Sequence, residues 1–247
     1  MIFAAGIGSR LKPFTDSHPK ALAPVCGVPA LERVLIRVRD AGIKKVVVNV
    51  HHFASQIIEF LEHNSFFGLD VTISDETGRL LDTGGGLLKA EELLMGSEPI
   101  LLHNADIITD ASISDMKQSH LSHGSDVTLL VSSRSSSRML YFSQSNLLQG
   151  WKNLNSGQQI PVSVNLENYI SMAFGGVHIV SPDIFKLLRR YEKEIAGEGN
   201  PFSIMPFYLW AINQLAIYGW CPPSPFRWFD IGTPEKLKAA GIAFCQA

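Results

Sequence analysis

Two cations follow a glycine-containing turn near the start of the chain. The apolar residues Met1–Ala5 predict a buried β-strand, and the turn after it contains Gly6 and Gly8, followed by Arg10 and Lys20. Backbone N–H groups and positive charge that converge after a strand are a means of binding phosphate. We therefore predict that this loop binds a nucleoside triphosphate.

The glycines alone do not define a nucleotide site, because a plain tight turn explains them equally well. A dinucleotide fingerprint needs a third glycine at the position of Leu11, and the Gly-Lys-Ser/Thr of a Walker loop is absent. Proline lacks the N–H that helices and ladders use, so we expect an ordered loop without helix or ladder strand. Its prolines are Pro13, Pro19, Pro24 and Pro29.

Two aspartates, far apart in sequence, could hold a metal ion. Asp106 closely follows the apolar strand predicted at 100–102, and Asp230 lies among aromatic residues. A buried carboxylate without partners is costly, so Asp230 needs a cation, a metal or hydrogen-bond donors nearby. Thr233 is the better cap for the final helix, so Asp230 is not needed as that cap. Two carboxylates are the smallest hard-oxygen set for Mg²⁺ on phosphates. We predict such a site, with a simple turn cap as the alternative for Asp106.

Three consecutive glycines, residues 84–86, open an expected helix after Asp82 and Thr83. They weaken that helix, which favours a close approach of the backbone to a flat group such as a base or ribose. The alternative is an ordinary helix start with a flexible entry. We assign no catalytic histidine, and no Ser-His-Asp or Cys-His pattern is visible in the sequence.

Apolar runs and helical periodicity alternate through the first half of the chain. This predicts right-handed βαβ crossovers and an α/β fold with a mostly parallel sheet flanked by helices. Ligands bind at the carboxyl ends of such strands, so the loops at 6–28, 75–86 and 104–110 should share one edge. The expected strands are 1–5, 45–50, 69–74, 99–103 and 126–132, and the expected helices are 29–40, 51–63, 83–94 and 112–122.

The second half of the chain is less regular. Residues 134–169 are rich in serine, asparagine and glycine, and we expect a small antiparallel excursion there. Strands are predicted at 171–180 and 216–220, and helices at 182–191, 202–211 and from 234 onward. Since no linker or internal repeat interrupts the pattern, we predict a single domain over residues 1–247.

The composition excludes several classes of partner. The 247 residues carry 21 basic and 23 acidic side chains, a net charge of −2 and no basic blocks, so nucleic acid is not an expected partner. No apolar stretch is long enough to span a bilayer, so we expect no membrane partner and a cytoplasmic location. Cys26, Cys221 and Cys245 lack metal-ligand spacing, and we predict reduced thiols.

The N-terminal loop resembles the signature of the sugar-1-phosphate nucleotidylyltransferases. That signature is a strand ending Ala-Ala-Gly, then x-Gly-Ser/Thr/Glu-Arg, a Pro and a Thr, Pro-Lys, and Pro-Val-x-Gly-x-Pro. The resemblance continues at residues 104–106 and 228–234. The matching residues of the loop are Ala4, Ala5, Gly6, Gly8, Ser9, Arg10, Pro13, Thr15, Pro19, Lys20, Pro24, Val25, Gly27 and Pro29.

The resemblance implies a Rossmann-like fold and a Mg²⁺-dependent transfer of a nucleotidyl group from a nucleoside triphosphate to a sugar 1-phosphate. Arg10 and Lys20 would be catalytic, and Asp106 and Asp230 would hold the metal. Asn104 and Gly176 would contact the sugar phosphate. The implied nucleotide-binding residues are Ala4, Ala5, Gly6, Gly8, Ser9, Arg10, Lys20, Thr83 and Gly84.

The chain departs from the family pattern at one important position. Many relatives carry a Glu-Lys-Pro motif, whose lysine contacts the sugar phosphate, before the strand equivalent to 171–180. Here residues 158–165 read Gln-Gln-Ile-Pro-Val-Ser-Val-Asn, and Lys152 is only a weak substitute.

Residues 82–86 look most like the short subgroup that includes the N-acetylmuramate 1-phosphate uridylyltransferases. UTP is therefore the preferred nucleotide, and the alternative is a GTP-using mannose- or heptose-1-phosphate guanylyltransferase. A non-catalytic nucleotide-sugar-binding regulator is a further alternative, although a mere binder need not keep both metal carboxylates. Leu11 disfavours a nicotinamide-dependent dehydrogenase.

Overall fold

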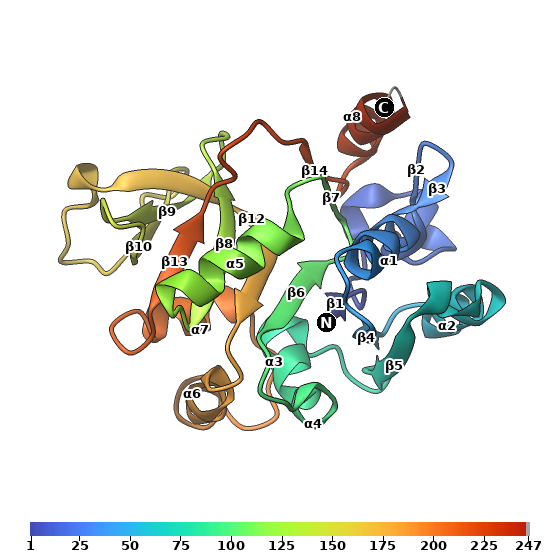
Figure 1. Ribbon diagram of the computed structural model, residues 1–247, viewed down its shortest axis with the longest axis horizontal. Helices are drawn as coiled ribbons and strands as arrows, with labels where there is room; N and C mark the ends of the chain where they lie inside the picture. Colours follow the sequence, from blue (N-terminus) through green and yellow to red (C-terminus); the bar gives the residue numbers. More distant parts are fainter. Residues whose placement is uncertain (246–247) are drawn as a thin grey trace.

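Four parallel strands form the N-terminal half of the main sheet in the computed structural model, which describes residues 1–245 (Figure 1). β1 (Ile2–Phe3) lies between β4 (Lys45–Val50) and β6 (Ile100–Asn104), and β5 (Asp70–Asp75) pairs with β4 at the edge. All four strands run in one direction, as the alternation of strands and helices predicts. Their carboxyl ends therefore face the same edge of the sheet.

One long antiparallel strand joins this half to the rest of the sheet. β12 (Ile170–Val180) pairs antiparallel with β6 on one side and with β8 (Val127–Ser132) on the other, and β13 (Ile217–Trp220) runs parallel to β8. The predicted Rossmann-like sheet with mostly parallel core strands is confirmed, and β12 is the antiparallel strand among these core strands, between β6 and β8.

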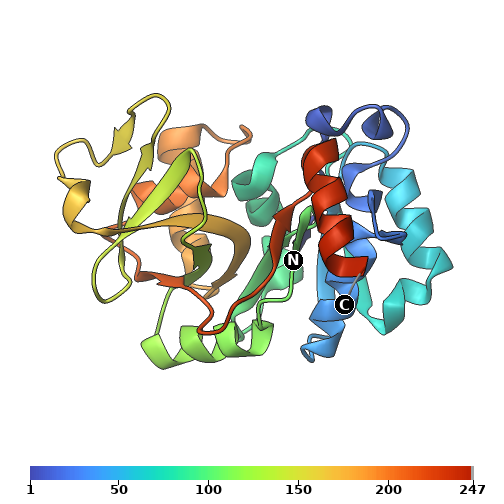
Figure 2. The ribbon, with the colours of Figure 1, turned by 90° about the horizontal axis from the view of Figure 1, so that it is seen from above.

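The predicted antiparallel excursion is present. β9 (Arg138–Phe142), β10 (Leu148–Asn153) and β11 (Gln159–Ile160) form a small antiparallel array that pairs with the first residues of β12. In Figure 2 this array lies at the left, and the central strands separate it from the N-terminal half of the molecule at the right. It builds one wall of a second cavity described below.

Eight α-helices cover the sheet in the described part of the chain. The expected helix at 83–94 is split at Ala90, and the helix expected from residue 51 begins after Phe53, whose φ of 53° is not helical. None of the helices of residues 1–245 combines the length and apolarity needed to cross a bilayer. The helices are α1 (Ala30–Asp40), α2 (Ala54–His63), α3 (Asp82–Lys89), α4 (Glu91–Leu94), α5 (Ile113–His123), α6 (Ile184–Tyr191), α7 (Ile204–Trp210) and α8 (Pro234–Cys245).

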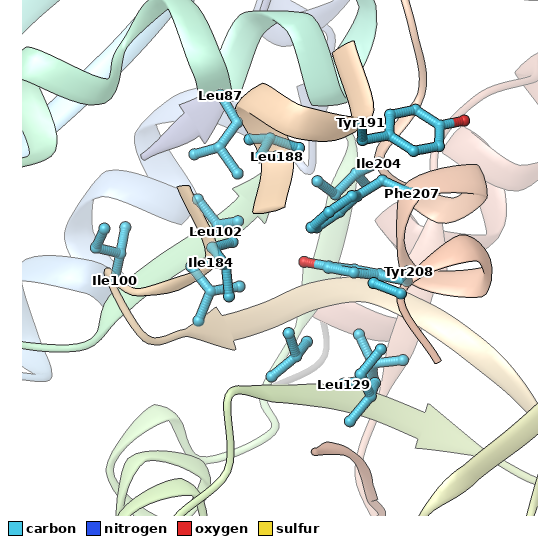
Figure 3. Packing of buried hydrophobic residues seen from close by; sticks show 14 of the residues in the cluster. Leu87, Ile100, Leu102, Leu129, Ile184, Leu188, Tyr191, Ile204, Phe207 and Tyr208 are labelled. Atoms are coloured by element: carbon cyan, nitrogen blue, oxygen red, sulfur yellow. The ribbon is translucent and has the colours of Figure 1, made fainter. Parts of the chain in front are cut away.

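Strand side chains alternate between two hydrophobic cores, one on each face of the sheet. Val46, Val48 and Val50 belong to the core beneath α1, α2 and α5, whereas Val47 belongs to the core beneath α3, α6 and α7. In the second core the rings of Phe207 and Tyr208 point from α7 toward the aliphatic side chains of α6 and β6 (Figure 3). The two cores fix the sheet between its helical layers.

The N-terminal loop contains a short pair of hydrogen-bonded strands, which its prolines did not predict. β2 (Pro24–Val25) and β3 (Val28–Pro29) form a two-residue hairpin, so the expectation of no ladder strand was wrong. Cys26 and Gly27 at its tip have φ values of 52° and 75°, as a tight type I′ turn requires. The prolines stand at the open ends of the hairpin, where a missing N–H does little harm.

The C-terminal segment returns to the N-terminal half. β14 (Trp228–Asp230) pairs antiparallel with β7 (Ile107–Thr109), a short strand just after β6. α8 then packs near β2, and Cys245 forms a disulfide with Cys26. The prediction of three reduced thiols was therefore wrong for this pair, because sequence spacing cannot show a contact between the two ends of the chain. The disulfide also removes the cysteine argument for a cytoplasmic location.

Candidate active site

The loop after β1 is packed around Gly8. Gly8 has a φ of +69°, and a Cβ atom added to it would lie 2.8 Å from Cβ of Lys20 and 2.9 Å from Cγ2 of Thr15. The Thr15 hydroxyl donates to the Gly8 carbonyl oxygen at 2.9 Å. No side chain fits at Gly8 unless Lys20 moves, so the turn sets the position of the cation.

A cavity of about 500 Å³ lies beside this loop, where β1, β4 and β6 end. It also draws on residues that the sequence did not single out, namely Asn49, Leu80 and Pro201. Six of the residues assigned to nucleotide binding line it: Ala4, Ala5, Gly6, Gly8, Lys20 and Thr83.

Asn49 and Glu76 form a polar pair that supports this cavity. Both are buried, and Asn49 donates from Nδ2 to Oε1 of Glu76 at 2.8 Å. Asn49 Oδ1 accepts the N–H of Ala4 at 2.7 Å, and Glu76 Oε2 accepts the N–H of Leu81 at 3.0 Å. Because buried polar groups need partners, these bonds tie together the loops that follow β1 and β5. The partners lie too far apart in sequence for spacing to reveal them.

The glycines at 84–86 approach the protein itself. A Cβ on Gly84 would collide with the Phe202 ring, and the N–H of Gly84 donates to the Phe202 carbonyl oxygen at 2.8 Å. A Cβ on Gly86 would lie 2.7 Å from Oε1 of Glu76. The flat group that requires Gly84 is therefore a phenyl ring, and in the described structure Gly84 lines neither of the two joined cavities.

A second cavity of about 870 Å³ adjoins the first. Asn104 and Asp106, at the end of β6, line both, so the two cavities meet there. The predicted residues Arg10, Gly176 and Asp230 also line the second cavity. Ser9, at the start of a short 3₁₀ turn (Ser9–Leu11), is exposed and is absent from the walls of both cavities in the described chain.

Lys20 stands between the two predicted metal ligands. Its side chain is only 12% exposed, and its ammonium pairs with the carboxylate of Asp106. Because β14 lies beside β7, the N–H of Ile231 donates to the Asp106 carbonyl oxygen at 3.0 Å. A Cβ on Gly232 would be 2.7 Å from Oδ1 of Asp230 and 3.3 Å from Nζ of Lys20. The fold thus brings both aspartates to one lysine.

Asp230 is surrounded by hydrogen-bond donors and positive charge. Lys236 donates from Nζ to its Oδ2 at 2.7 Å, and the N–H of Gly232 donates to its Oδ1 at 2.7 Å. Burial alone would raise the pKa of Asp230, but these hydrogen bonds and the charge of Lys20 outweigh burial and hold the pKa below its usual range. Asp230 is therefore ionised at neutral pH.

The pair of carboxylates suits a cation shared with a substrate. Among residues 1–245, no group of three or more His, Cys, Asp or Glu gathers that could hold a metal ion by itself. Mg²⁺ at nucleotide sites uses one or two carboxylates and completes its ligands with phosphates and water. Asp106 and Asp230 fit that pattern.

The second cavity also contains basic side chains that the sequence did not single out. Arg134, Arg138 and Lys236 line it, together with the predicted Arg10. Lys152, the substitute considered for the missing family lysine, is not part of its wall as far as the described residues show. Arg134 follows β8 and stacks on Trp228 of β14. The two residues are far apart in sequence, so no local pattern predicts this contact.

The fold and the joined cavities at the carboxyl edge of the sheet define an α/β protein built to bind nucleotides. The sequence model described as "Nucleotidyl transferase" matches residues 1–142, which is more than half of the chain, so the chain belongs to that family.

Curated relatives cover the whole length. The chain is 29% identical over 258 residues to the N-acetylmuramate alpha-1-phosphate uridylyltransferase of Caulobacter vibrioides, with 100% of this chain and 97% of the relative covered. It is 28% identical to the mannose-1-phosphate guanyltransferase beta-B of Xenopus laevis, with 100% of this chain and 64% of the relative covered. These relatives bear out the resemblance to sugar-1-phosphate nucleotidylyltransferases.

Solved structures share the fold. An apo UDP-glucose pyrophosphorylase aligns with a TM-score of 0.76 and 18% identity, covering 99% of this chain and 97% of that one. HddC from Yersinia pseudotuberculosis, in complex with GMP-PN, aligns with a TM-score of 0.74 and 20% identity, covering 98% and 97%. At this level of identity the comparison supports the architecture described above.

Proposed function

We propose that the chain, as a single domain, transfers a uridylyl group from UTP to a sugar 1-phosphate, with N-acetylmuramate 1-phosphate as the preferred acceptor. The observation that carries this proposal is the pair of cavities that meet at Asn104 and Asp106. One cavity lies against the phosphate-binding loop and suits the nucleotide. The other is large enough for a sugar and ends at the same carboxylate.

In the proposed reaction an oxygen of the sugar phosphate attacks the α-phosphorus of the triphosphate in line. A new P–O bond forms, the bond to the bridging oxygen of the β-phosphate breaks, and pyrophosphate leaves with that electron pair. A phosphate oxygen is already ionised and nucleophilic, so no protein nucleophile is needed. Arg10 and Lys20 neutralise the charge of the triphosphate and align it, which is the main task in such transfers.

Asp106 and Asp230 would hold Mg²⁺, which supplies charge neutralisation of the phosphates when bound. Each carboxylate accepts a hydrogen bond from a lysine in the structure, Asp106 from Lys20 and Asp230 from Lys236. Lys20 lines the first cavity and Lys236 the second, so each cavity has a lysine beside a predicted metal ligand, where phosphate charge would be placed.

The preference for UTP and N-acetylmuramate 1-phosphate rests on the two curated uridylyltransferase relatives of full length. A guanylyltransferase acting on mannose 1-phosphate is the second candidate, because the Xenopus relatives span this whole chain at 27–28% identity.

The test is a matrix of four nucleoside triphosphates against several sugar 1-phosphates, with Mg²⁺, read out as pyrophosphate release. UTP with N-acetylmuramate 1-phosphate should give the highest kcat/KM. A maximum with GTP and mannose 1-phosphate would select the second candidate. Binding of UTP without turnover of any acceptor would contradict the proposal and favour a regulator.

A further inference from the structure

The sequence lacks the Glu-Lys-Pro lysine that the family resemblance implies, yet the second cavity is basic. Four cationic side chains line it. Arg10 and Arg138 are exposed to solvent, and Lys236 donates a hydrogen bond to Asp230. Arg134 differs from the others because it is half-buried and held by a cation–π stack and by hydrogen bonds to two carbonyl oxygens.

Arg134 is fixed against β14 and β12. Its guanidinium carbon lies 3.8 Å from the centroid of the Trp228 ring, which is a close cation–π stack. Its Nη2 donates to the carbonyl oxygen of Phe174 at 2.7 Å. Trp228 is itself anchored, because its Nε1 donates to the Gly175 carbonyl oxygen at 2.7 Å. The guanidinium is therefore positioned before any substrate arrives.

Most of the hydrogen-bonding capacity of Arg134 is unused. A guanidinium has five N–H donors. Nη2 donates to Phe174 and Nη1 to the Ser135 carbonyl oxygen at 3.5 Å, while Nε is buried without a hydrogen-bond partner among residues 1–245. A buried cation with unsatisfied donors is costly for the fold. Nε is out of reach of a ligand, but one N–H of each terminal nitrogen remains for an acceptor in the cavity that Arg134 lines.

The stack also ties Arg134 to the reaction centre. Trp228 and Asp230 are two residues apart on β14, so their side chains leave the strand on the same face. Arg134, Trp228 and Asp230 all line the second cavity. Burial lowers the pKa of Arg134 and the nearby charge of Asp230 opposes that effect, so the two charged groups are close enough to interact.

We propose that Arg134 binds the phosphate of the acceptor sugar and orients it for attack, in place of the missing family lysine. This inference rests on the proposed function, since it assigns a residue to the acceptor in that same site. The planar fork of a guanidinium matches two phosphate oxygens at once, and the Trp228 stack restricts its rotation.

The test compares Arg134→Gln and Arg134→Lys with Lys152→Gln as the matched control. KM values for the sugar 1-phosphate and for the nucleoside triphosphate are measured separately, with thermal unfolding of each variant. Arg134→Gln should raise the KM for the acceptor by about tenfold to a hundredfold, the range expected for a lost charged hydrogen bond, and should change the KM for the triphosphate by less than about twofold. Arg134→Lys should lie between, and Lys152→Gln should match the wild type.

Two further measurements separate the possible failures. Calorimetric titration with the same sugar 1-phosphate reports binding without turnover, and Arg134→Gln should weaken it by a similar factor. A wild-type acceptor KM in Arg134→Gln, or an equal rise of both KM values with a lower unfolding temperature, would overturn the inference while the proposed function stands. If the wild-type protein neither binds nor turns over any sugar 1-phosphate, the proposed function fails and the inference fails with it.

Discussion

At the scale of single residues, the centre of the site is a set of opposite charges at short range. Asp106 is paired with Lys20, and Asp230 with Lys236, so each predicted metal ligand already has a cationic neighbour. Opposite charges at this range attract, so each pair holds its two side chains in place. When a phosphate substrate binds together with a metal cation, the lysines can pair with the phosphate and the aspartates with the metal.

The two aspartates should each be essential. Asp106→Asn and Asp230→Asn keep the shape of the side chain and remove its charge, so turnover should fall on the order of 100-fold or more. Steady-state pyrophosphate release at saturating Mg²⁺ measures this. Asp16→Asn is the matched control, because Asp16 pairs with Lys12 at 2.9 Å in the same loop but lines neither joined cavity among the described residues. Near-wild-type rates in either of the first two variants would remove the metal assignment.

Gly8 should tolerate no side chain. Gly8→Ala introduces a methyl group 2.8 Å from Cβ of Lys20 at a φ of +69°, so the lysine must leave its present position. We expect kcat/KM to fall by roughly tenfold or more, as when a positioning group is displaced by a fraction of an ångström. Gly96→Ala is the control, since an added Cβ there meets no atom within 4 Å. Equal activity of the two variants would show that the position of Lys20 is unimportant.

Residue types and their spacing predicted the part of this candidate site that is local in sequence. The run from Gly6 to Lys20 is local, and its glycines, cations and prolines could be interpreted together. Arg134 and Asn49 could not be found in this way, because their partners, Trp228 and Glu76, are brought to them by strand pairing. The close neighbour of Gly84 could not be found in this way either, since Phe202 is distant in sequence.

At the scale of elements, the local sequence pattern predicted where a strand or helix forms better than it predicted the direction in which a strand runs in the sheet. The β-branched run at Lys45–Val50 was predicted with its observed bounds, because a buried parallel strand needs a continuous apolar sequence. Periodicity could not show that β12 runs antiparallel between β6 and β8, since pairing depends on the whole topology. The hairpin of β2 and β3 was missed because the prolines at its ends obscured the turn at Cys26 and Gly27.

The disulfide joins two elements of the site, the loop after β1 and α8. Its cysteines are 219 residues apart in sequence, so the bond should stabilise the fold by roughly 2–4 kcal/mol through restriction of the unfolded chain. Urea unfolding of Cys26→Ser should show this loss, and the wild type in reductant should resemble the variant. Cys221→Ser is the control, because Cys221 is a free, exposed cysteine and should have no such effect. Equal stability of all three proteins would contradict the bond.

At the scale of the whole molecule, stability should depend on pH through buried histidines. Burial lowers the pKa of His103 and of His178 to about 3, below the usual 6.5 of the unfolded chain. The unfolded chain therefore binds more protons, and the free energy of unfolding falls as pH drops below about 6.5, by up to about 1.4 kcal/mol per pH unit for each ring.

Chemical unfolding at pH 7, 6 and 5 measures this dependence above the range in which carboxylates titrate. His178→Gln should reduce the slope by the share of that ring and leave the share of His103, while His63→Gln, at an exposed position, should leave the slope unchanged. A free energy of unfolding that is constant from pH 7 to pH 5 would contradict the neutral, buried state of these rings.

The central feature of the candidate site is that β14, late in the sequence, pairs with β7 and places Asp230 near Lys20. The most direct test of that arrangement is pyrophosphate release from UTP and N-acetylmuramate 1-phosphate with Mg²⁺, measured for the wild type and for Asp230→Asn in parallel. We predict turnover by the wild type that depends on both substrates and is lost in the variant. No turnover of any sugar 1-phosphate with any nucleoside triphosphate, or equal turnover by both proteins, would contradict the account.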